Sequence, residues 1–163
     1  MFEAIVGVVV VGCVLLAFVA YQRSQTAVPP PNPIEANDPE MAAARSMAKA
    51  TLDEFRSLYS AYPNASQVKL PVISSDGIVE WMVGSVLELN DTYVKVEFRG
   101  RPATHRGAFQ PIQSFPTREI ADWHVVLSNG KVRGGYTQRV HFERMRAAGK
   151  LVGSAAEEAA KYE

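Results

Sequence analysis

The fold is decided by residues 78–99, which read IVEWMVGSVLELNDTYVKVEFR. Apolar and polar side chains largely alternate along this stretch, a pattern typical of half-buried β-strands. Asn90 and Asp91 interrupt the alternation, so we expect residues 78–89 and 92–99 to form a β-hairpin. With Leu89 opposite Thr92, the hairpin gains one apolar face, made of Val79, Trp81, Val83, Leu87, Leu89, Val94, Val96 and Phe98.

A second hairpin is predicted around Asn129–Gly130, a dipeptide typical of tight hairpin turns. Placing Ser128 opposite Lys131 puts Trp123 opposite Tyr136 on an apolar face. The opposite face is then polar and carries Asp122, His124, Arg133, Thr137, Arg139 and His141. Such a face is expected on the outside of an antiparallel sheet.

A long amphipathic helix is predicted for residues 38–62. Asp38 suits the N-cap and Pro39 the first helical position, and Pro63 ends the pattern. Apolar residues recur every three or four positions, at Met41, Ala44, Ala48, Leu52, Phe55, Tyr59 and Tyr62. Residues 67–73 read as a strand at a sheet edge because Pro71 lacks an N–H. We expect a short helix at residues 143–148 and a frayed or loosely helical end after it.

Residues 4–20 read AIVGVVVVGCVLLAFVA and carry no charge. A run from Ala4 through Cys13 to Ala20 is about long enough for a transmembrane helix, with residues 2–21 in contact with the bilayer. Alternatives are a cleaved signal peptide, a lipoprotein signal at Cys13 and a buried core helix. Arg23 follows the segment, so the positive-inside rule favours the cytoplasmic side of the membrane for the remaining chain, and the opposite orientation stays open.

The expected organisation therefore has four parts. A transmembrane anchor occupies residues 1–23, and a Pro-rich linker occupies residues 24–37, where it acts as a stiff spacer or as a ligand for aromatic grooves. An α+β domain covers residues 38–148, and an Ala/Glu-rich tail covers residues 149–163. The predicted fold class is α+β, with one long N-terminal amphipathic helix on a small antiparallel sheet, preceded by a single transmembrane helix.

Charge and motifs limit the classes of function. The chain has 17 basic and 17 acidic residues, so we expect no nucleic-acid partner, because such binding depends on neutralising phosphates. Its single cysteine excludes an intrachain disulfide. We find no phosphate-binding glycine loop, metal-binding cysteine pairs or nucleophile elbow, so we expect no metal and no cofactor.

Candidate site residues form three groups. Asp122, His124 and Arg139 could form an anion-binding or acid–base site, or simply a solvated face of the sheet. The loop RGRPATHRG at residues 99–107 could bind a carboxylate or phosphate through groups such as His105 and Arg106, or be merely solvated. The glycines Gly134–Gly135, next to Tyr136–Thr137, could leave room for a ligand or allow close helix packing.

Together these segments resemble a bacterial family, the domain of unknown function 2314. The resemblance runs from Asp38-Pro39-Glu40-Met41 through Glu80-Trp81 and Ile120-Ala121-Asp122-Trp123 to the segment NGKVRGGYT at residues 129–137. The family usually has Glu-His-x-Trp where this chain has Glu80-Trp81, so the family's histidine is missing; Glu80 and Thr137 join the candidate site residues. The resemblance implies a small α+β fold and a bacterial source and implies no activity.

Three functions remain open. We expect a membrane-anchored binding or interaction module for an unknown protein or small molecule, rather than an enzyme, because no catalytic motif is present. One alternative is a hydrolase-like enzyme that uses Asp122, His124 and Arg139. Another is an exported structural protein of the cell envelope.

Overall fold

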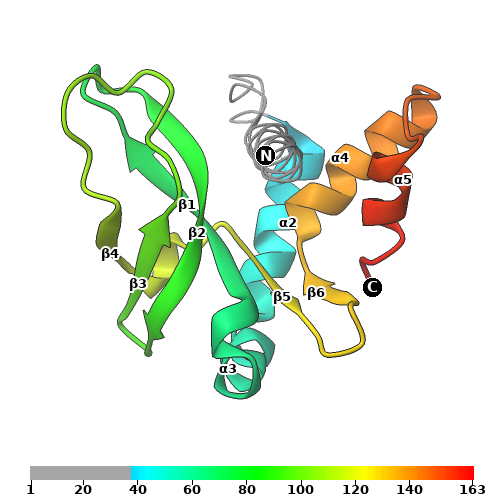
Figure 1. Ribbon diagram of the computed structural model, residues 1–163, viewed down its shortest axis with the longest axis horizontal. Helices are drawn as coiled ribbons and strands as arrows, with labels where there is room; N and C mark the ends of the chain where they lie inside the picture. The colour runs from blue at the N-terminus through cyan, green and yellow to red at the C-terminus, as the bar shows by residue number, and fades with distance from the viewer. Residues whose placement is uncertain (1–37) are drawn as a thin grey trace, which may run out of the picture. The chain divides into compact units, whose positions relative to one another are not determined.

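The computed structural model describes residues 38–163, drawn in colour in Figure 1. The predicted transmembrane segment at residues 4–20 and the linker at residues 24–37 lie outside this range. Among residues 38–163, no helix is both long enough and apolar enough to cross a bilayer. The fold class is therefore corrected: what the structure contains is helices packed on a six-stranded antiparallel sheet.

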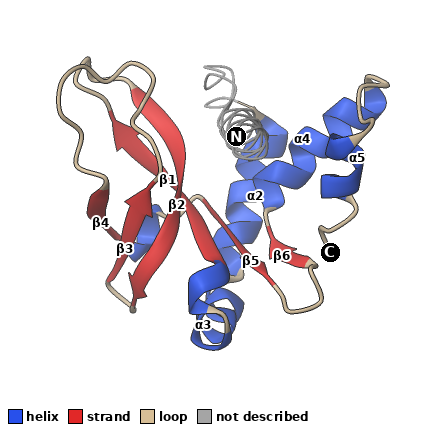
Figure 2. Ribbon diagram, viewed as in Figure 1, coloured by secondary structure: helices blue, strands red, loops and turns tan. Residues whose placement is uncertain are grey.

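The sheet runs in the order β4-β3-β2-β1-β5-β6, and every neighbouring pair is antiparallel. Figure 2 shows the strands in red and the helices in blue, with the helices gathered beside β5 and β6. The strands are β1 (Ser66–Ile73), β2 (Val79–Leu89), β3 (Tyr93–Phe98), β4 (Ile112–Pro116), β5 (Asp122–Val126) and β6 (Val132–Gly134). Two short 3-10 helices, η2 (Pro63–Ala65) and η3 (Thr117–Glu119), precede β1 and β5.

Strand β1 lies inside the sheet, so its predicted edge position is wrong for the strand as a whole. Its first half, from Ser66 to Lys69, pairs with β5, and its whole length from Gln67 to Ile73 pairs with β2. The second half, which contains Pro71, has no partner strand on the side away from β2. On that side Pro71 has no neighbouring strand, so its missing N–H leaves no inter-strand hydrogen bond unmade. The prediction of an edge is therefore correct for this half of the strand.

The predicted apolar face of the first hairpin is wrong for part of β2, because the strand contains a β-bulge. Val86 pairs with Val96, but Glu88 pairs with Lys95, so Leu87 is an extra residue. A bulge shifts the alternation of side chains by one position along the strand. Leu89 therefore faces the core with Val94, Val96 and Phe98, whereas Val79 and Val83 face outward and are 51% and 48% exposed.

The second hairpin turns where predicted, but it is much shorter. Leu127 N donates to Lys131 O, and Gly130 adopts φ +79°, so three residues form the loop. His124 pairs with Gly134, and the chain then leaves the sheet. Tyr136 and Thr137 begin a helix rather than continuing the predicted strand.

The predicted long helix is two helices, α2 (Pro39–Ala50) and α3 (Leu52–Ala61). Asp38 caps α2 as expected, with its carboxylate accepting from the backbone N–H groups of Glu40 and Met41. The break falls at Thr51, whose hydroxyl donates to the carbonyls of Met47 and Ala48. Such bonding by a threonine back to the preceding turn is a known cause of helix bending.

Two further helices complete the described chain. Helix α4 (Tyr136–Ala147) is longer than the predicted helix at residues 143–148, and α5 (Ser154–Ala159) lies in the predicted tail. The end of the chain packs instead of fraying: the Tyr162 ring contacts Phe142 at 5.2 Å between centroids. Lys161 O accepts from Val132 N, which ties this end to β6.

The core lies between α2, α3 and one face of the sheet. Phe55 on α3 stacks on Trp123 of β5 at 5.2 Å, and both side chains are buried. Trp123 Nε1 donates to the carbonyl of Ala48 at 3.1 Å, so the ring's one polar atom is satisfied. Buried valines of β1, β2 and β3 extend the same core toward β4.

Candidate functional site

Asp122, predicted to be part of a polar face, is a buried helix cap. Its two carboxylate oxygens accept from the backbone N–H groups of Trp123, Tyr136 and Thr137 and from the Thr137 hydroxyl, at 2.6–3.1 Å. The first N–H groups of a helix have no partner within the helix, and a carboxylate satisfies them and interacts favourably with the helix dipole. Asp122 therefore fixes the start of α4 on β5.

Gly134 and Gly135 form the joint between β6 and α4. Gly134 has φ +81°, and a Cβ there would lie 2.2 Å from the carbonyl oxygen of Trp123. Gly135 has φ +66°, and a Cβ there would lie 2.4 Å from the Tyr162 ring. The pair thus allows close packing of backbone and ring, and it leaves no room for a ligand.

His124 and Arg139 lie at the same joint. His124 is partly buried, and burial lowers the pKa of its imidazole, an effect that Asp122 and Glu158 oppose. Arg139 Nε donates to the carbonyl of Gly134 at 3.0 Å, and its guanidinium lies over the Tyr136 ring. Burial also raises the pKa of the Tyr162 hydroxyl to about 12. The structure thus brings these predicted residues together, but as supports of the joint between β6 and α4.

Glu80 organises the loop that follows β3. Its buried carboxylate accepts from the backbone N–H groups of Ala103 and Thr104 and from the Thr104 hydroxyl, at 2.5–2.8 Å. Burial raises the pKa of Glu80, but these hydrogen bonds outweigh that effect and hold the pKa below its usual value. Glu80 therefore gives this loop a defined shape.

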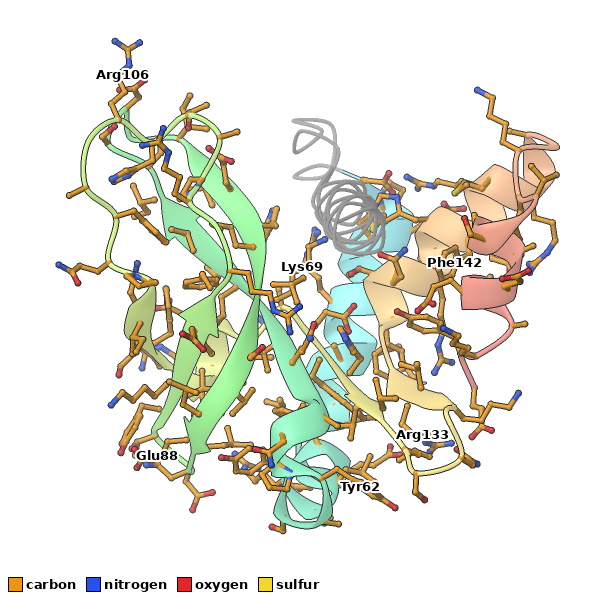
Figure 3. All side chains as sticks on the ribbon, viewed as in Figure 1. Tyr62, Lys69, Glu88, Arg106, Arg133 and Phe142 are labelled. Carbon is orange, nitrogen blue, oxygen red and sulfur yellow. The ribbon has the colours of Figure 1, made fainter. Side chains whose placement is uncertain are left out.

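His105 extends this loop toward β1. Its Nδ1 accepts from Ser75 N at 3.1 Å, so Nε2 carries the proton and donates to Ala108 O at 3.1 Å. Its ring also contacts the edge of Phe109. Arg106 N donates to the Ser75 hydroxyl, while the Arg106 side chain is exposed at the tip of the loop near Asp76 (Figure 3). The loop therefore positions His105 and Phe109, and Arg106 points away from them.

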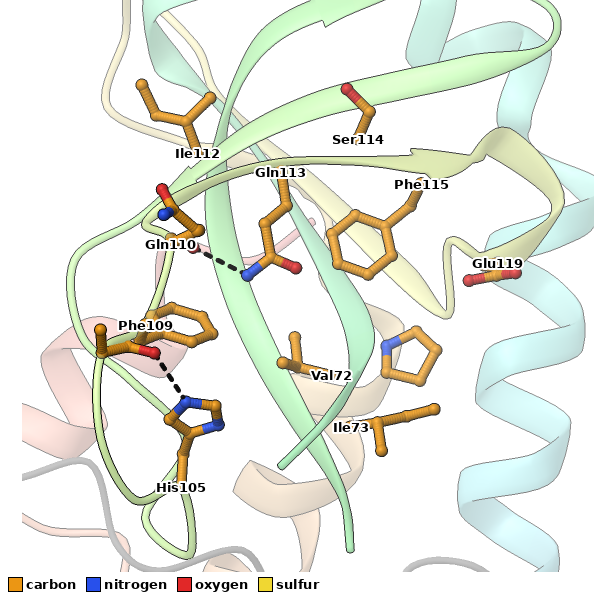
Figure 4. Close-up of a pocket in the computed structure, with 12 residues that line it drawn as sticks. Val72, Ile73, His105, Phe109, Gln110, Ile112, Gln113, Ser114, Phe115 and Glu119 are labelled. Carbon is orange, nitrogen blue, oxygen red and sulfur yellow. Dashed lines mark hydrogen bonds between the residues drawn. The ribbon is translucent and has the colours of Figure 1, made fainter. Parts of the chain in front are cut away.

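A cleft of about 730 Å³ lies between β1, β4 and this loop (Figure 4). We call it the seam cleft, because β1 and β4 line it together although β2 and β3 separate them in the sheet. The sheet must therefore curl so that β1 and β4 approach each other. Its apolar lining includes Val72, Ile73, Phe109, Ile112 and Phe115, and its polar groups include His105, Gln113 and Glu119.

Sequence reasoning found only His105 among the residues that line the seam cleft. Phe109 and Phe115 reach it because both rings pack near Phe98, at about 6.0 Å between centroids. Two features of the sequence, Pro71 and Pro116, could have indicated the two edges of the sheet that meet at the cleft. A proline within a strand marks a position where an inter-strand hydrogen bond is missing. Pro116 ends β4, which is the edge strand of the sheet.

The sequence matches no protein-family model, no curated protein and no solved structure. The resemblance to the domain of unknown function 2314 therefore stays a prediction.

Proposed function

We propose that residues 38–163 form a binding module that takes up an extended polypeptide segment in the seam cleft. One observation carries the proposal: two strands with unpaired edges line the same cleft. An unpaired edge presents backbone donors and acceptors in a row, and an added strand of another polypeptide can satisfy them.

The first unpaired edge belongs to β4. Phe98 N donates to Pro111 O and Thr117 N donates to Thr92 O, so alternate residues of β3 direct their backbone groups toward β4. In the β3–β4 register, Gln113 and Phe115 face back toward β3. Because the direction alternates along a strand, Ile112 and Ser114 direct their N–H and C=O groups away from β3, where the sheet ends.

The second unpaired edge is the end of β1. Ser74 N donates to Ile78 O on the side of β2, whereas Lys69 O accepts from Ala121 N on the opposite side. By the same alternation, the C=O group of Pro71 and the N–H and C=O groups of Ile73 point away from β2, beyond the reach of β5. Four of the five outward-directed residues of the two edges, Pro71, Ile73, Ile112 and Ser114, line the seam cleft; the fifth, Pro116, does not.

The side chains of the cleft suit an occupant with an apolar group. Ile73 is 69% exposed and Ile112 is 47% exposed, one on each edge. Covering such surface contributes about 25 cal/mol for each Å² removed from water. Gln113 adds a polar contact: its Nε2 donates to Gln110 O, and among the described residues its carbonyl oxygen has no partner. That oxygen is placed to accept from an occupant.

Selection of peptides by the full-length chain tests the proposal. A displayed library of short linear peptides is panned against the chain, and the affinities of enriched peptides are measured by fluorescence polarisation. We expect enriched peptides with apolar residues at alternating positions. Ile73→Arg and Ile112→Arg should each weaken binding by about tenfold or more, because each places a charge against the occupant.

Val126→Arg is the matched control, because Val126 is an exposed strand residue, 42% exposed, that does not line the cleft. It should leave the affinities unchanged. The proposal is wrong if no peptide is enriched, or if the Ile73 and Ile112 variants bind the selected peptides as well as the Val126 variant does.

The hydrolase alternative gains no support from the described geometry. Asp122 uses both oxygens to cap α4, and Arg139 bonds the backbone of the same joint. Asp122, His124 and Arg139 line neither the seam cleft nor the smaller pocket beside it. No observation on the described residues favours a structural role in the cell envelope.

We propose further that the module works at the cytoplasmic face of a bacterial inner membrane. The support is the sequence alone, through the uncharged segment at residues 4–20 and Arg23. Fractionation of cells should find the full-length chain with the inner membrane, and protease added to spheroplasts should leave the domain intact. Recovery in the soluble fraction, or digestion in spheroplasts, would contradict this location.

A further inference from the structure

A second pocket, of about 380 Å³, adjoins the seam cleft. We call it the basic pocket, because Arg45 and Lys49 of α2 and Arg118 of η3 line it together with Trp81. Pro71 and Glu119 line both hollows, so the two are neighbours at the open end of β1. An extended occupant of the seam cleft that follows β1 past Pro71 reaches the basic pocket.

The charges of the basic pocket are unbalanced. It has three cationic side chains and one carboxylate, that of Glu119, whereas the whole chain has equal numbers of basic and acidic residues. Within residues 38–163, Lys49 and Arg118 form no ion pair. Lys49 and Arg118 are therefore available to an anionic partner.

Trp81 gives the pocket a fixed wall. The Arg45 guanidinium carbon lies 5.7 Å from the centre of the Trp81 ring, a cation–π arrangement that limits where the guanidinium can move. The pocket thus combines one oriented guanidinium with two exposed cations.

Resting on the proposed function, we propose that the extended segment bound in the seam cleft carries aspartate or glutamate residues at one end, and that Lys49 and Arg118 receive them. Charge complementarity supports this occupant, because carboxylates match the guanidinium and ammonium groups. The seam cleft then recognises the extended segment, and the basic pocket determines which acidic segments bind and in which direction they lie.

A pair of peptides tests the inference on the full-length chain. A neutral peptide selected for the seam cleft is extended at one end by Glu-Glu or by Gln-Gln, and the same pair is made at the other end. At low salt we expect the Glu-Glu extension to tighten binding about fivefold or more at one end only. Added salt should reduce this gain, since exposed ion pairs are screened.

The double variant Lys49→Gln/Arg118→Gln should lose the gain from Glu-Glu and keep the affinity for the neutral peptide. The control Lys131→Gln/Lys150→Gln removes the same charge from exposed positions outside the pocket and should retain the gain. Equal affinity for the Glu-Glu and Gln-Gln peptides overturns the inference and leaves the binding module standing. Failure of the neutral peptide to bind overturns the module itself. The double variant is also tested on phosphatidylserine vesicles. If it loses binding to the vesicles and keeps its affinity for the Glu-Glu peptide, the pocket binds lipid and the inference is overturned.

Discussion

At the scale of single residues, Asp122 matters because one carboxylate satisfies four donors at the junction of β5 and α4. Asp122→Asn turns one acceptor into a donor that faces the Thr137 N–H and hydroxyl. We expect the free energy of unfolding in urea to fall by about 2–4 kcal/mol, because buried donors lose a charged acceptor. Asp91→Asn, at a side chain that is 92% exposed, should change it by less than about 0.5 kcal/mol. Equal effects would contradict the capping role.

Gly134 allows the backbone strain and the steric clash to be measured separately. Gly77 has a similar φ of +76°, but nothing lies within 4 Å of the position that an added methyl group would occupy, whereas at Gly134 that position is 2.2 Å from the Trp123 carbonyl oxygen. Gly77→Ala should cost about 1 kcal/mol, the conformational penalty alone. Gly134→Ala should cost at least about 2 kcal/mol more, because strand β5 or β6 must move. If Gly77→Ala and Gly134→Ala lose the same unfolding free energy, the close approach of Gly134 to the Trp123 carbonyl does not contribute to stability.

At the scale of elements, the end of the chain acts as a clamp on β6 and α4. Tyr162→Ala removes the ring that packs on Phe142 and covers Gly135. We expect a loss of about 2 kcal/mol in unfolding free energy, less than for a fully buried aromatic residue. The amide of Val132, which donates to Lys161 O, should exchange faster with deuterium.

Tyr162→Phe is the control for the clamp, because it keeps the ring and removes only the hydroxyl. It should retain most of the stability and the slow exchange at Val132. Unchanged exchange in Tyr162→Ala would mean that the backbone bonds hold this end without the ring.

At the scale of the whole molecule, His124 makes stability depend on pH. Burial lowers its pKa in the folded state below the ordinary value of 6.5. As pH falls through about 6.5, the unfolded chain binds a proton that the folded chain resists, so stability decreases. Urea unfolding between about pH 7 and pH 5.5 should show this decrease, and His124→Gln should flatten it.

Glu80 contributes at lower pH, because its lowered pKa means that stability is lost as pH falls below its ordinary value of 4.5. A slope that persists in His124→Gln between about pH 7 and pH 5.5 would assign the titration to another group.

The candidate site was only partly predictable. Asp122, Gly134, Gly135 and Thr137 come together as their sequence proximity to the second hairpin indicated, but their hydrogen bonds are used to build α4. The seam cleft depends on how far the sheet curls and on which residues lie beyond β5. The residues next to Phe109 and Phe115 in the sequence do not indicate how closely β1 and β4 approach each other. That approach depends on packing between distant segments, such as the contacts of both rings with Phe98.

Short stretches of sequence were enough to specify the mixture of helices and antiparallel strands, the start of α2 at Asp38 and the turn near Gly130. Each depends on a few adjacent residues: a cap, a proline at the first helical position, or a glycine with positive φ. The bulge at Leu87, the change from β6 to α4 and the seam between β1 and β4 emerged only in the folded chain. Those features depend on hydrogen bonds and packing between distant segments, whose balance no short stretch of sequence contains.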